Sequence, residues 1–218
     1  MSAIVKMGTD AWSSYVYHAA IFNLQILPET LMCGIIILSI LLANQPLVAV
    51  AAGIGITQIL TQTIGRLVMG RAPSAGTPRS SLDPCSTGFV GKSWARLTGS
   101  DTALMWHPLA PSIYLSTIGF FAGWGTALHQ IYKDEIDAGI VQRPALVATM
   151  VVSAFIVLLA FAFRVYSGCE SLLGASTGLA IGLLFGFLGC IALSYATERK
   201  GTNIWGIPLL RKRNKHRQ

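Results

Sequence analysis

Charged residues are scarce in this chain. Of its 218 residues, 11% are charged and 53% are hydrophobic, whereas a soluble domain typically carries about 25% charged residues. This shortage of charge excludes an ordinary soluble domain. The length suits one compact membrane domain and leaves little for a second. We therefore expect an all-α integral membrane protein.

Cysteine and histidine are also scarce, with four residues of each. No pair has the spacing of zinc ligands, so we expect no metal site and no cofactor. Cys33 and Cys190 fall inside apolar stretches, where cysteine packs as a small apolar residue. Cys85 and Cys169 are expected on one side of the membrane, so a disulfide between them is possible if that compartment is oxidising.

What the chain has instead is long apolar stretches. Stretches of about 20 apolar residues predict membrane-spanning helices. Five are present, at residues 27–43, 46–69, 108–128, 145–163 and 172–194. Because Asn44 and Gln45 alone separate the first two, we expect these to form a tight helical hairpin.

The two ends of the chain differ from this bundle. Residues 1–26 mix aromatic and charged side chains, which suits the headgroup level of a membrane; the alternative is a partial sixth span. The prediction is thus an interfacial segment at 1–26, a transmembrane helical bundle of five or six spans at 27–195, and a basic tail at 196–218.

The basic tail predicts the orientation. Basic residues in short flanks stay on the cytoplasmic or equivalent side. The tail has seven of them: Arg199, Lys200, Arg211, Lys212, Arg213, Lys215 and Arg217. Counting back through five spans, residues 133–143 form a polar loop on that same side, and residues 70–107 and 164–171 face the other. The tail suits anionic lipid headgroups; nucleic-acid binding is not expected, because no aromatic residue interleaves the run at 211–217.

The most informative stretch is Phe163-Arg-Val-Tyr-Ser-Gly-Cys-Glu170, followed by Ser-Leu-Leu-Gly174. It resembles the third signature of the type 2 phosphatidic acid phosphatase superfamily, Ser-Arg-x5-His-x3-Asp, which opens the last membrane span. Arg164 matches the arginine. Glu170 stands at the position of the nucleophilic histidine, and Gly174 at that of the aspartate that orients it.

A second stretch, Ala110-Pro-Ser-Ile-Tyr114, resembles the Pro-Ser-Gly-His signature of the same superfamily. Ser112 matches the serine, and Tyr114 replaces the histidine that acts as an acid. A tyrosine hydroxyl can donate a hydrogen bond. With an ordinary pKa near 10 it is a poor general acid at neutral pH.

The third candidate, Arg66-Leu-Val-Met-Gly-Arg-Ala-Pro73, resembles the first signature, Lys-x6-Arg-Pro. Aligning Arg66 with the lysine leaves Pro73 at the arginine position, and aligning Arg71 with the arginine puts Ile64 at the lysine position. Either register loses one cation. The resemblance covers about residues 46–195, and all three candidates are expected on one membrane face.

The resemblance implies a phosphatase-shaped site without its catalysts. In the superfamily, arginines bind phosphate oxygens and the histidine attacks phosphorus, forming a covalent intermediate. Here the nucleophile, its orienter and the acid are all replaced. We therefore expect a catalytically degenerate member, kept as a structural or accessory subunit of a larger membrane assembly, with membrane lipids and other proteins as partners.

Two other functions remain open. One is an active lipid phosphate or pyrophosphate phosphatase with a divergent site at Arg66, Arg71, Arg164 and Glu170, to which His107 could contribute an imidazole. The other is anion or lipid transport. Many transporters have inverted repeats, and none is evident in this sequence.

Each candidate residue also has a structural interpretation. Arg66 could extend to the headgroups from the end of its span, and Arg164 could be an interfacial anchor. Glu170 could close an internal ion pair with an arginine, because isolated charges are costly in a membrane. The glycines at 178, 182 and 186 recur every four residues and predict close helix packing, within the bundle or against a partner.

Overall fold

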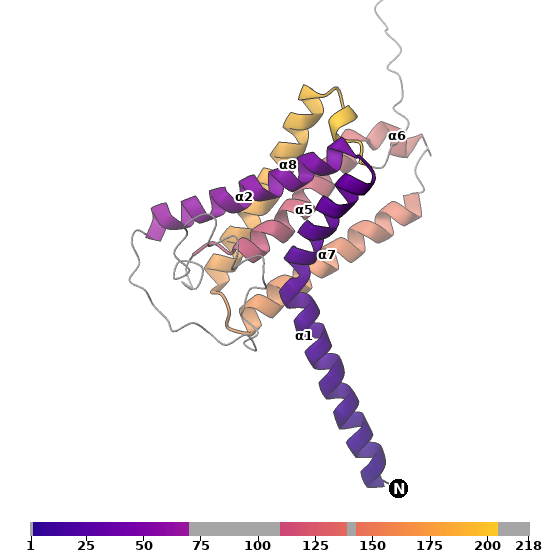
Figure 1. Cartoon of the computed structure of the whole chain (residues 1–218), viewed down its shortest axis with the longest axis vertical. Helices are drawn as coiled ribbons and strands as arrows, with labels where there is room; N and C mark the ends of the chain where they lie inside the picture. Colours follow the sequence, from indigo (N-terminus) through magenta and orange to yellow (C-terminus); the bar gives the residue numbers. More distant parts are fainter. Residues whose placement is uncertain (1, 70–109, 139–142, 205–218) are drawn as a thin grey trace, which may run out of the picture.

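The computed structural model describes residues 2–69, 110–138 and 143–204, and every regular element in this part of the chain is helical (Figure 1). The all-α prediction is confirmed, and each of the five apolar stretches corresponds to one long helix. The long helices are α1 (Ser2–Leu41), α2 (Gln45–Met69), α5 (Ile113–Ile131), α7 (Arg143–Tyr166) and α8 (Leu172–Ala196). Two short elements, α6 (Lys133–Asp137) and the 3₁₀ helix η1 (Lys200–Thr202), complete them.

Helices α5 and α8 form the centre of the bundle, and glycines let their backbones touch. A Cβ atom on Gly182 would lie 2.0 Å from the carbonyl oxygen of Ser116, and one on Gly186 would lie 2.1 Å from that of Phe120. From the other helix, a Cβ on Gly123 would lie 2.2 Å from the carbonyl oxygen of Leu183. The predicted close packing is confirmed, and it occurs within this chain.

Helix α2 packs on α5 through apolar and polar residues. Val50 and Ile54 join Phe120 and Trp124 in an apolar cluster. One turn further along α2, the amide of Gln58 donates to Thr117 Oγ1 at 3.0 Å. Hydrogen bonds between polar side chains help to hold helices together where water is excluded.

The turn between α1 and α2 is the predicted tight hairpin. Ala43 has a φ of 46°, and Asn44 Oδ1 accepts the backbone N–H of Leu47 at 3.4 Å. The Asn44 side chain also donates to the carbonyl of Ile204 at 3.3 Å, so the hairpin is joined to the residues after α8.

Within residues 2–69, 110–138 and 143–204, two helices are long and apolar enough, by length and composition, to cross a membrane. They are the Gln45–Leu67 part of α2 and the whole of α8. Shorter apolar stretches lie at Ile26–Leu41 of α1 and Met150–Tyr166 of α7. Large apolar side chains are exposed on the outer surfaces of α7 and α8, among them Phe155, Leu158 and Leu184.

Helix α1 is a single helix of 40 residues with Pro28 inside it. At 1.5 Å per residue it is about 60 Å long, and its first half extends away from the other helices (Figure 1). The helix crosses the expected boundary at residue 26 without interruption. The assignment of residues 1–26 to the headgroup level stays a prediction.

Candidate functional site

The start of α5 and the start of α8 are held together by backbone contacts. Ser112 is the N-cap of α5, and its Oγ accepts the N–H of Leu115 at 3.0 Å. The N–H of Ser112 donates to the carbonyl of Gly174 at 3.0 Å. Ser112 and Gly174 are therefore adjacent. The Ser112 hydroxyl is already engaged in capping its own helix.

Arg164 lies in the last turn of α7, and its charge is balanced by Glu170. Both its Nε and its Nη2 donate to Glu170 Oε1, at 3.0 and 2.7 Å. The side chains are 6% and 11% exposed. The predicted internal ion pair is confirmed, and Arg164 is buried.

The turn from α7 to α8 places Glu170 beside the arginine six residues earlier. The backbone N–H groups of Cys169 and Glu170 both donate to the carbonyl of Arg164, at 3.1 and 3.3 Å. Gly168, with a φ of 67°, provides the left-handed residue that this turn uses. Ser171 then caps α8 by accepting the N–H of Gly174.

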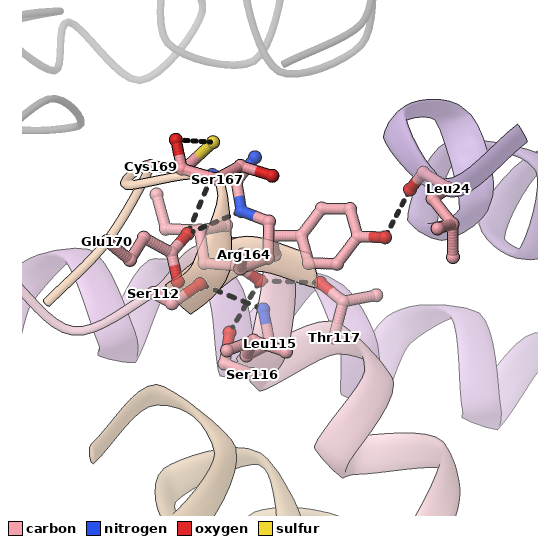
Figure 2. A network of polar contacts seen from close by, with 11 residues as sticks. Leu24, Ser112, Leu115, Ser116, Thr117, Arg164, Ser167, Cys169 and Glu170 are labelled. Carbon is pink, nitrogen blue, oxygen red and sulfur yellow. Dashed lines mark hydrogen bonds and ion pairs between the residues drawn. The ribbon is translucent and has the colours of Figure 1, made fainter. Parts of the chain in front are cut away.

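Tyr114 covers the other side of the arginine. The guanidinium carbon of Arg164 lies 4.8 Å from the centre of the Tyr114 ring, a cation–π distance. The Tyr114 hydroxyl donates to the carbonyl of Leu24 in α1. Figure 2 shows Arg164 beside Glu170 and the contact to Leu24. Tyr114, Arg164 and Glu170 form what we call the Arg164 cluster.

In the Arg164 cluster, Glu170 neutralises the positive charge of Arg164. A phosphate-binding arginine needs unengaged donors, and here Nε and Nη2 share one carboxylate oxygen. Glu170 Oε2 is buried and has no hydrogen-bond donor among the described residues. The cluster contains no imidazole or thiol, the usual activated nucleophiles.

The remaining candidate residues are not all placed. Arg66 lies in the last turn of α2 with an exposed side chain. Asn44, just before α2, bonds to Ile204, and Gln58, in the middle of α2, bonds to Thr117 in the first turns of α5. Helix α2 therefore runs toward the end of the bundle that holds the Arg164 cluster. Arg71 and His107 lie outside the described residues. Among the residues that are described, no group of three side chains could hold a metal ion.

Cys169, next to Glu170, is disulfide-bonded. Cys33 and Cys190 are free. Cys190 is buried in the apolar core as expected, whereas Cys33 is exposed on α1. The fourth cysteine of the sequence, Cys85, lies outside the described residues.

A second cluster of the same residue types, Tyr132, Glu135 and Arg199, lies at the other end of α5. Arg199 Nη1 donates to Glu135 Oε1 at 2.9 Å, and Glu135 is fully buried. The Tyr132 hydroxyl donates to the carbonyl of Arg199 at 2.8 Å. The guanidinium carbon of the same arginine lies 5.9 Å from the centre of the Tyr132 ring. Burial raises the pKa of Tyr132 above its ordinary value near 10. We call this set the Arg199 cluster.

Sequence reasoning missed the Arg199 cluster. It assigned residues 133–143 to a polar loop and Arg199 to the basic tail. One available signal was the spacing of the two tyrosines: Tyr114 and Tyr132 are 18 residues apart, which is about five turns of helix and puts them on one face.

Comparisons of the chain with protein-family models, with curated proteins and with solved structures find no match.

Proposed function

We propose that this chain is a catalytically inactive, phosphatidic-acid-phosphatase-like membrane protein that serves as a structural or accessory subunit of a larger membrane assembly. The observation that carries the proposal is the ion pair in the Arg164 cluster. The arginine that would bind phosphate is buried against an internal carboxylate and covered by a tyrosine ring.

The electrostatics of this arrangement oppose phosphatase chemistry. A phosphate group entering beside Arg164 would meet the negative charge of Glu170 at the same donors, and like charges at close range repel strongly where water is excluded. Tyr114 and Gly174 offer neither an acid suited to neutral pH nor a group to orient a nucleophile. The divergent phosphatase remains the alternative, and it requires Arg164 to be released from Glu170.

The proposal includes five spans, formed by α2, α5, α7, α8 and the second half of α1. It is supported by the two long apolar helices, the two shorter apolar stretches and the exposed apolar side chains between the two clusters. Disulfides persist in oxidising compartments, so the Cys169 end would face away from the cytoplasm. Exposed Lys133 and Lys200 lie at the opposite end, in agreement with the basic-residue rule.

An accessory role is supported by the length of α1. A bilayer has a hydrocarbon core about 30 Å thick, and α1 is about twice that length. A helix that extends well beyond its own bundle offers a surface for other proteins.

The accessory role is tested by the size of the protein in its native membranes. After mild solubilisation and native electrophoresis, we expect the chain to migrate in an assembly with a partner at constant stoichiometry. A variant shortened to begin at Phe22 should leave the assembly while keeping its own fold. Migration of the full chain as a lone monomer would contradict the proposal.

A further inference from the structure

Pro28 removes one hydrogen bond from the middle of α1. In an α-helix the N–H of each residue donates to the carbonyl four residues earlier, so residue 28 would normally donate to Leu24. Proline has no N–H, and its ring crowds that same carbonyl. The Leu24 carbonyl therefore lacks its usual helical donor. Leu24 is partly buried, so water has limited access to this carbonyl.

Tyr114 supplies the missing donor. Its hydroxyl donates to the carbonyl of Leu24, the very group that Pro28 leaves without a helical partner. In membrane helices, prolines are tolerated where a neighbouring helix satisfies the freed backbone group. Tyr114 itself is 6% exposed and is held by Arg164, which is held by Glu170.

We propose that Pro28 and Tyr114 form a hinge and a latch. Pro28 makes the middle of α1 the point where this helix bends most readily, and the Tyr114 hydroxyl fixes the direction of its first half. Through Tyr114, that direction is coupled to the Arg164 cluster. A force applied to the first half of α1 would be transmitted to the ion pair, and a change in the ion pair would release the first half of α1. This coupling does not depend on the proposed function.

A double-mutant cycle tests the latch. Tyr114→Phe keeps the ring under Arg164 and removes the donor, so we expect the Tm in detergent to fall by about 2–4 °C. Pro28→Ala restores an N–H at residue 28. In that background, we expect Tyr114→Phe to lower the Tm by less than half as much. An equal loss in both backgrounds would overturn the latch, as would no loss in either.

Tyr132→Phe is the matched control. It removes the tyrosine hydroxyl at the other end of α5, whose partners are Arg199 and Thr202, and its effect should be the same in the parent and in the Pro28→Ala background. If Tyr114→Phe alone does not fold, the double variant with Pro28→Ala must fold. Failure of both would contradict the proposal.

The hinge is tested by distances between spin labels at residue 14 of α1 and residue 188 of α8, with Cys33 and Cys190 replaced by serine. We expect one narrow distance distribution in the parent, a broad one in Tyr114→Phe, and a narrow one again when Pro28→Ala is added. An unchanged distribution in folded Tyr114→Phe would overturn the hinge.

Discussion

Arg164 is a buried cation, and its counter-ion in the described part of the chain is Glu170. Removing one partner of a buried ion pair leaves a charge without compensation and typically costs about 3–5 kcal/mol. We therefore expect Glu170→Gln to lower the free energy of unfolding by roughly that amount, measured by denaturant titration in detergent. Replacing both residues by apolar ones, as Arg164→Met with Glu170→Leu, should cost much less.

The exposed residue Lys133 provides the control. Lys133→Gln changes one charge outside both clusters and should change stability by no more than about 0.5 kcal/mol. If Glu170→Gln were as mild as Lys133→Gln, the ion pair would not be a structural element, and the proposal that Glu170 neutralises Arg164 would fail.

At this scale, sequence reasoning found the contacts that are local in the chain. Arg164 and Glu170 are six residues apart across one turn, and their pairing could be anticipated because a membrane bundle penalises isolated charges. The bond from Tyr114 to Leu24 joins residues 90 positions apart. It depends on how α1 crosses α5, which no local pattern specifies.

At the scale of the helices, the backbones of α5 and α8 are in direct contact. Because a Cβ on Gly182 would lie 2.0 Å from a backbone oxygen, Gly182→Ala must push the two helices apart. Overpacking of this kind typically costs about 1–3 kcal/mol. We expect that loss in the free energy of unfolding, together with weaker hydrogen-exchange protection along both helices.

Gly55 in α2 is the matched control, since a Cβ there would meet nothing within 4 Å. Gly55→Ala should be neutral or stabilising by up to about 1 kcal/mol, because alanine is the better helix former. Equal effects at Gly182 and Gly55 would mean that the two helices are not in the close contact described.

The long helices were largely predictable from the length of the apolar stretches. The residues at which these helices begin and end were less predictable. The third stretch was expected to begin at Pro108, but α5 begins at Ile113, where Ser112 caps it. The short helix α6 was missed, because Lys133–Asp137 has the composition of a loop. Glu135 is nonetheless fully buried, and it forms an ion pair with Arg199.

At the scale of the whole molecule, two clusters of like composition mark the two ends of α5. The 18 residues from Tyr114 to Tyr132 span about 27 Å, close to the hydrocarbon thickness of a bilayer. In the proposed five-span arrangement, each cluster lies at a membrane surface, where charged and aromatic side chains are favoured. In that proposed arrangement, an ion pair holds the bundle at each face, and the charges of Arg164 and Glu170 are paired with each other.

The most direct test of this account is phosphate release by the purified, folded protein from a panel of lipid phosphates and pyrophosphates. Arg164→Ala is assayed beside it. We expect the parent and the variant to release phosphate at the same background rate as an empty-detergent control. Turnover by the parent well above that background, lost in Arg164→Ala, would contradict the account and identify a working phosphatase.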